Sequence, residues 1–137
     1  MQILIVEDDA IVAHDVEETL RTTGVEVYVA ANADDALSLA ERTAFDLALL
    51  DVRLGYGESG LMLAEMLLER HAIPSLLVTG LGELPEHVGS YALGVLAKPF
   101  SPGDLVSAVQ AVRSALTGQT VPAGPAGLTL FSGRDRS

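Results

Sequence analysis

The sequence of 137 residues predicts a single α/β domain, in which a parallel sheet lies between two layers of helices. Short apolar or β-branched runs alternate about five times with segments of helical periodicity, which is the pattern of repeated βαβ units. The run at 47–50 is nearly all apolar, as expected for a strand that is covered on both faces. Four of the runs also end at a side chain that can take part in chemistry.

The elements follow one another with short connections. The expected strands are residues 2–6, 25–30, 46–50, 74–78 and 94–97. The expected helices are residues 9–23, 33–43, a third helix marked by Leu61, Ala64 and Leu68, a short helix at 86–93, and 102–116.

Capping residues support several of these boundaries. Asp9 and Asn32 are candidate N-caps, and Gly24 is placed to end the first helix as a C-cap. The helix at 86–93 has the weakest support: Pro85 suits a first turn, but Gly89 interrupts the segment.

The chain changes composition after residue 116. Residues 117–137 hold two prolines, four glycines and few large apolar side chains. We therefore expect a domain at 1–116 followed by a flexible tail at 117–137, in which 128–131 form a short apolar patch that is a candidate for docking.

Charge and composition narrow the class of protein. The net charge of −11, with 19 acidic against 8 basic residues, disfavours direct binding to nucleic acid or to anionic membranes. The absence of cysteine excludes disulfides and thiolate metal sites. No run is long enough to span a bilayer and no secretory signal is evident, so we expect a cytoplasmic protein.

The residues at the strand ends are the main functional signal. Glu7 and Asp8 follow the first strand, and Asp51, Thr79 and Lys98 follow the third, fourth and fifth. The carboxyl ends of parallel strands lie at one edge of a sheet, where ligands bind. Three carboxylates, a hydroxyl and an ammonium should therefore meet there, which suits a divalent metal ion and a phosphoryl group.

Four motifs carry a resemblance to a known family. ILIVEDD, LALLDVRL, LLVTG and VLAKPF, in this order, resemble the receiver (CheY-like) domain of bacterial two-component response regulators. The resemblance implies a flavodoxin-like, three-layer α/β/α sandwich with five parallel strands in the order 2-1-3-4-5. It also implies a signalling switch that is not an enzyme, apart from catalysing its own phosphorylation and dephosphorylation.

The resemblance assigns roles to individual residues. Asp51 would accept the phosphoryl group, and Mg²⁺ (or Mn²⁺) would be held by Glu7, Asp8, Asp51 and the backbone carbonyl of Arg53. Thr79 and Lys98 would contact the phosphoryl oxygens. The peptide bond before Pro99 is expected to be cis.

Partners follow from the same resemblance. A histidine kinase or a histidine-containing phosphotransfer protein would be the donor, and an unknown downstream protein would contact the fourth helix, the last strand and the last helix. The apolar edge of the last helix is also compatible with a homodimer.

Three departures from the family pattern affect this interpretation. The loop at 52–60 lacks a proline near Gly55. Arg53 and Leu81 occupy positions that influence loss of the phosphoryl group, and we expect a long-lived phosphorylated state. The switch position, usually aromatic, is Val95.

Other classes of function make different demands on these residues. A receiver-like module that no longer takes phosphate stays open, as does a phosphate sink or relay intermediate. An aspartyl phosphatase would need an acid where Arg53 stands, and the acidic run after the first strand would repel a flavin phosphate. His14, His71 and His87 have no metal-ligand spacing, and we expect surface or packing roles for them.

Overall fold

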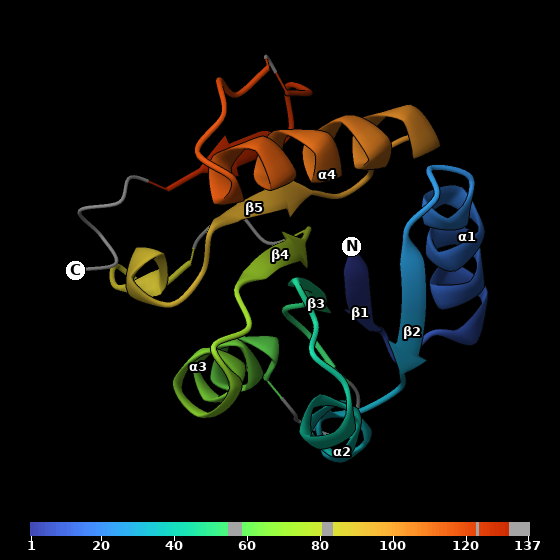
Figure 1. The fold of residues 1–137 in the computed structure, drawn as a ribbon, viewed down its shortest axis with the longest axis vertical. Coiled ribbons are helices and arrows are strands. Elements are labelled where there is room, and N and C mark those ends of the chain that lie inside the picture. Colours follow the sequence, from blue (N-terminus) through green and yellow to red (C-terminus); the bar gives the residue numbers. More distant parts are fainter. Residues whose placement is uncertain (55–58, 81–83, 123, 132–137) are drawn as a thin grey trace.

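The computed structural model describes residues 1–54, 59–80, 84–122 and 124–131. They form one six-stranded sheet in the order β2-β1-β3-β4-β5-β6 (Figure 1). The strands are β1 (Gln2–Val6), β2 (Glu26–Ala30), β3 (Leu47–Asp51), β4 (Ser75–Thr79), β5 (Gly94–Ala97) and β6 (Leu128–Leu130). The helices are α1 (Ala10–Arg21), α2 (Ala33–Arg42), α3 (Gly60–His71) and α4 (Pro102–Leu116).

Helices cover both faces of the sheet. One apolar cluster joins the sheet to α1 and α4, and a second joins it to α2 and α3 (Figure 1). Ile3 and Ile5 belong to the first cluster, whereas Leu4 and Val6 belong to the second, as expected from the alternation of side chains along a strand. The predicted three-layer α/β sandwich is confirmed. Among the described residues, no helix has the length and apolar character needed to cross a membrane.

Most predicted elements are confirmed to within one or two residues at their ends. Asp9 caps α1, because its Oδ1 accepts hydrogen bonds from the backbone N–H groups of Ile11 at 2.9 Å and Val12 at 3.2 Å. Asn32 caps α2 in the same way, and Gly24 adopts a left-handed φ of 85° just after α1.

The helix predicted at 86–93 is wrong. The segment forms only a 3₁₀ turn at Val88–Ser90 before β5 begins at Gly94. Glycine is a poor helix former, and Gly89 is buried at the centre of the turn. Val88 and Gly89 are both buried in this turn, and Val88 joins the apolar cluster beside α2 and α3.

The five predicted parallel strands are confirmed in the predicted order 2-1-3-4-5, but the sheet has a sixth strand that was not predicted. Residues 128–130 form β6, which pairs antiparallel with β5, so this part of the predicted flexible tail is an edge strand of the sheet. The apolar patch at 128–131 docks because β5 otherwise presents a row of unpaired backbone N–H and C=O groups. Residues 123 and 132–137 of the predicted tail lie outside the described residues.

Gly60 sets the position of α3 against the end of β3. Its backbone N–H donates to the carbonyl oxygen of Val52 at 2.9 Å. A Cβ atom at this position would collide with the carbonyl oxygen of Asp51 and would lie only 3.0 Å from the Cα of Val52. The first residue of α3 is therefore required to be glycine if the helix is to start this close to Asp51.

We expect Gly60→Ala to lower the free energy of unfolding by about 1–3 kcal/mol, because the new methyl group overpacks rigid backbone. Chemical denaturation measures the change. Gly103→Ala in α4 is the matched control, since the nearest atom to an added Cβ there is the Ser101 Oγ at 3.8 Å. The control should keep or slightly raise stability, and equal effects of the two changes would contradict this account.

Candidate functional site

Strand register brings the predicted residues to one edge of the sheet. Val6 pairs with Leu50 across β1 and β3, so Glu7 and Asp51 follow in neighbouring positions. Thr79 pairs with Ala97 across β4 and β5. Glu7, Asp51, Thr79 and Lys98 consequently lie at the carboxyl ends of four strands that are adjacent in the sheet.

Asp51 is held by two hydrogen bonds. Its Oδ2 accepts from the Lys98 Nζ at 3.0 Å, and its Oδ1 accepts from the backbone N–H of Arg53 at 3.0 Å. The Asp51 side chain is 12% exposed and that of Lys98 is 34% exposed. The acidic side chain is thus oriented from both sides while one direction stays open to solvent.

Lys98 links two of the acidic side chains. Its Nζ lies 3.7 Å from the Oε1 of Glu7, in addition to its contact with Asp51. Burial lowers the pKa of Lys98, but the hydrogen bond and charge of Asp51, together with Glu7, outweigh this effect and hold the pKa above its ordinary value. Lys98 is therefore the permanent positive charge of the site.

Three carboxylates are close enough to share a cation. Oxygens of Glu7, Asp8 and Asp51 all lie within 4.8 Å of one another. Two of these side chains are largely buried, whereas Asp8 is exposed. A hard divalent cation such as Mg²⁺ prefers carboxylate oxygens plus water, so this donor set fits Mg²⁺.

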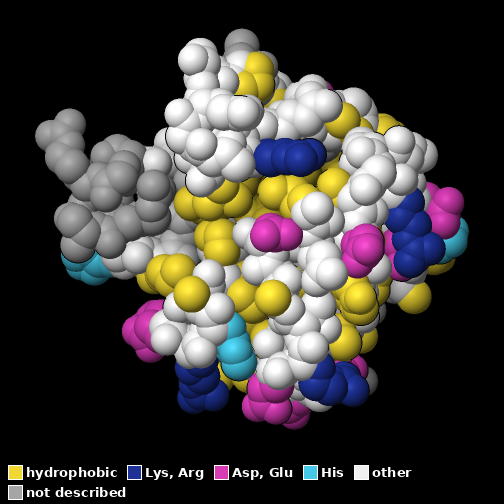
Figure 2. All heavy atoms as spheres, in the orientation of Figure 1, with side chains coloured by type: hydrophobic (Ala, Val, Ile, Leu, Met, Phe, Trp, Pro, Cys, Tyr) yellow, Lys and Arg dark blue, Asp and Glu magenta, His cyan; other side chains and the backbone are white. Residues whose placement is uncertain are grey.

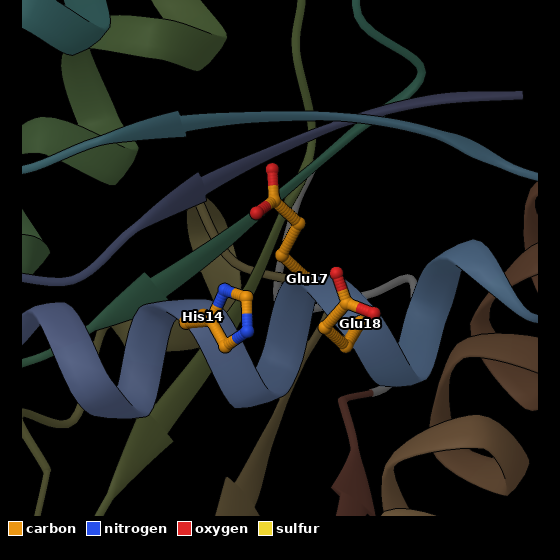
Figure 3. Close-up of side chains that lie close together, drawn as sticks. All are labelled: His14, Glu17 and Glu18. Atoms are coloured by element: carbon orange, nitrogen blue, oxygen red, sulfur yellow. The ribbon is translucent and has the colours of Figure 1, made fainter.

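A second group of possible ligands lies on the outside of α1. His14, Glu17 and Glu18 follow one another along this helix (Figure 3). His14 and Glu18 are exposed, and the Oε2 of Glu17 pairs with Arg21 at 2.9 Å. The group comes from the outer side of a single helix, whereas the strand-end carboxylates lie at the ends of two neighbouring strands, β1 and β3. It therefore adds no support for a metal site.

Among the remaining predicted residues, Thr79 and Pro99 are backbone neighbours of Lys98. Thr79 is buried, and its carbonyl oxygen accepts from the backbone N–H of Lys98 at 2.9 Å. The Lys98–Pro99 bond is cis, as expected. Val95 is half-buried in β5. Leu81, like the loop at 55–58, lies outside the described residues.

Sequence reasoning missed two contributions to the site. The first is Gly60, which allows α3 to start directly against Asp51; its place at the close of a glycine-rich loop was the available signal. The second is the Arg53 backbone N–H, which donates to Asp51. From the sequence, roles were predicted for the Arg53 carbonyl and side chain but not for this N–H group.

Glu7 carries the most perturbed carboxyl group described. Burial raises its pKa from an ordinary 4.5 to about 7, and the charge of Asp51 and the contact with Asp8 act in the same direction. The backbone N–H of Asp9 and the charge of Lys98 oppose the shift. Below about pH 7 this side chain holds a proton, which weakens attraction for a cation.

The shift has a defined sign for stability. Between pH 4.5 and about 7 the folded protein binds more protons than the unfolded chain at Glu7, so stability falls as pH rises through this window. We expect Glu7→Gln to abolish this contribution, on the order of 2 kcal/mol between about pH 5 and about pH 8. Denaturant unfolding of the metal-free protein at both pH values measures it.

Glu41→Gln, at an exposed position of α2, is the control and should preserve the pH dependence of the wild type. Identical pH dependence in the wild type and the Glu7→Gln variant would contradict the proposed protonation of Glu7.

Comparison with known proteins identifies related domains. The family model described as "Response regulator receiver domain" matches residues 3–110. The chain is 36% identical over 107 residues to the transcriptional activator protein PfeR of Pseudomonas aeruginosa, covering 76% of this chain and 35% of that protein. It is 31% identical to the regulatory protein VanR of Enterococcus faecium, covering 80% and 48%. The chain thus spans half the length of these relatives or less.

Solved structures of related proteins have the same fold. A CheY-like receiver domain protein from Methanospirillum hungatei JF-1 superposes with a TM-score of 0.74 at 32% identity, over 86% of this chain and 94% of that one. The chemotaxis response regulator CheY4 of Vibrio cholerae gives 0.71 at 28% identity, over 80% and 95%. With a family match over most of the chain and the same fold in these structures, the protein belongs to the response regulator receiver domain family.

Proposed function

We propose that this receiver domain takes a phosphoryl group on Asp51 from a phosphohistidine of a histidine kinase or a histidine-containing phosphotransfer protein. The observation that carries the proposal is the position of the Asp51 carboxylate, 3.0 Å from the Lys98 ammonium and within 4.8 Å of carboxylate oxygens of Glu7 and Asp8. The change in charge at Asp51 would then alter binding to another protein.

The residues present support a transfer step of this kind. A carboxylate oxygen of Asp51 forms the new bond to phosphorus while the P–N bond of the donor breaks, and its electron pair stays with the imidazole, which takes up a proton. Lys98 is within reach of the phosphoryl oxygens as soon as it releases the Asp51 carboxylate. Catalysis of phosphoryl transfer is mainly positioning and charge stabilisation, which this arrangement supplies.

A divalent cation would complete the site. Glu7, Asp8 and Asp51, with the backbone carbonyl of Arg53, would hold Mg²⁺ or Mn²⁺. The cation would neutralise charge on the phosphoryl oxygens. The Thr79 hydroxyl would bond to one of those oxygens after transfer and so connect the phosphorylation state to the end of β4.

The surface that transmits the signal is a second part of the proposal. The family resemblance points to the predicted fourth helix, the last strand and the last helix. In this chain these correspond to the segment at 86–93, β5 and α4. In this chain the first of these is only the 3₁₀ turn at Val88–Ser90, and β6 lies on the outer edge of β5. A partner protein would therefore meet a different surface from the one that the sequence predicted.

We expect the protein to gain one phosphoryl group, about 80 Da, on incubation with acetyl phosphate and Mg²⁺. Intact-mass spectrometry detects the gain, which should vanish without Mg²⁺ and in Asp51→Asn. Asp34→Asn, an exposed position in the first turn of α2, is the control and should still be phosphorylated. No gain under any condition would contradict the proposal and favour a receiver-like module that works without phosphate.

The phosphorylated state should persist for minutes or longer, because the Arg53 side chain at this position screens the acyl phosphate. Mass spectrometry after removal of acetyl phosphate follows the decay. Arg53→Ala should shorten the lifetime severalfold, whereas Arg70→Ala, at an exposed position of α3, should leave it unchanged. A lifetime of seconds in the wild type would contradict the role given to Arg53.

A further inference from the structure

The outer edge of β5 is a binding site for one extended strand, which β6 fills. Backbone hydrogen bonds mark both ends: the Ala97 N–H donates to the Gly127 carbonyl at 2.9 Å, and the Phe131 N–H donates to the Leu93 carbonyl at 2.8 Å. Val95 is the register partner of Thr129 between them.

The site is specific in shape. Gly94 lies so close to β6 that a Cβ there would collide with the carbonyl oxygen of Thr129. Leu128 and Leu130 pack on the cluster beside α1 and α4, and Phe131 packs on the cluster beside α2 and α3. The edge therefore accepts a strand with the alternation Leu-x-Leu followed by an aromatic ring.

The hold on β6 is nevertheless weak. The strand has 3 residues, none of them fully buried. Leu130 and Phe131 border an open hollow of about 820 Å³, whose wall continues along α4 to Leu116 and the exposed Val121. Hydrophobic side chains gather between α4 and the lower helices α2 and α3 on the face seen in Figure 2. Local opening of β6 should thus cost less than unfolding the sheet.

The connection to β6 allows the strand to reach a neighbouring molecule. Residues 117–127 separate α4 from β6, and an extended segment of this length spans on the order of 35 Å. Gly118, with a φ of 74°, and Pro122 lie within the connection. The hinge is therefore long enough for β6 to leave its own sheet without disturbing α4.

We propose that the partner for this edge is a second copy of the chain, which docks its own residues 127–131 on β5 to form a strand-exchanged dimer. Every copy carries the one segment already seen to fit the edge, so exchange restores the same hydrogen bonds and apolar contacts and needs no new interface. The edge that β6 vacates on opening presents unpaired backbone groups, which drives recapture of a strand from either copy.

Cysteine cross-linking tests the proposal directly, because the chain has no cysteine of its own. Val95→Cys and Thr129→Cys are made as separate variants, mixed at high concentration and oxidised. Antiparallel partners have Cα atoms about 5.5 Å apart, which a disulfide can bridge. The double variant V95C/T129C, oxidised when dilute, reports whether the strand closes on its own copy.

A disulfide-linked dimer containing one chain of each variant, identified by mass, is the expected result. Val29→Cys on the opposite edge of the sheet, mixed with Thr129→Cys, controls for random collision and should give several-fold less cross-linked dimer. Adding Gly94→Ala to the chain that carries Val95→Cys should suppress the mixed dimer, because that edge no longer accepts a strand.

Closure of the dilute double variant without any mixed dimer above the control would overturn the proposal, since β6 would then stay on its own copy. Mixed dimer that survives Gly94→Ala would also overturn it, because the contact would not be the one on β5. Neither readout depends on phosphorylation of Asp51.

Discussion

The contact between Lys98 and Asp51 is the interaction on which the site depends. Three carboxylates converge at the ends of β1 and β3, and their mutual repulsion in a partly buried position would be costly without a compensating positive charge. The Lys98 ammonium, 3.0 Å from Asp51 and 3.7 Å from Glu7, supplies that charge. Burial raises the pKa of Glu7 to about 7, so below that pH its protonation removes a further negative charge.

The same balance of charge bears on the proposed binding of a cation and a phosphoryl group. A divalent cation would replace the proton on Glu7 as the compensating charge, and a phosphoryl group on Asp51 would give Lys98 a new partner. Each event exchanges one form of charge compensation for another in a fixed frame. This frame consists of the strand ends, which backbone contacts such as the Lys98 N–H with the Thr79 carbonyl at 2.9 Å join together.

The outer edge of β5 is the second feature that shapes the molecule, because β6 pairs with its backbone groups there. The proposed exchange of β6 and the proposed phosphoryl transfer meet on β5, since Ala97, which bonds Gly127, directly precedes Lys98. A partner that binds this side would compete with β6 for the edge of β5. Among the described residues, the 3₁₀ turn at Val88–Ser90, where a helix was predicted, precedes this strand in the chain, and β6 pairs with its outer edge.

The sequence by itself predicted the five parallel strands, the four long helices and which residues are candidates for the site. These follow from local pattern: apolar runs that form strands, helical periodicity with capping residues such as Asp9 and Asn32, and polar side chains at strand ends. The order of strands and the roles of Asp51 and Lys98 came from family resemblance, because the sequence holds no direct record of which strands are neighbours.

Only the tertiary structure decided the rest. The segment at 86–93 was predicted as a helix with weak support, and in the fold it forms one 3₁₀ turn in which Val88 and Gly89 are buried. Residues 128–130 have too little local signal for a strand and become one because β5 offers an unpaired edge. The pKa of Glu7 and the need for glycine at position 60 depend on distances across the sheet and between α3 and β3. Such distances arise from packing between segments far apart in the chain, which local sequence patterns do not specify.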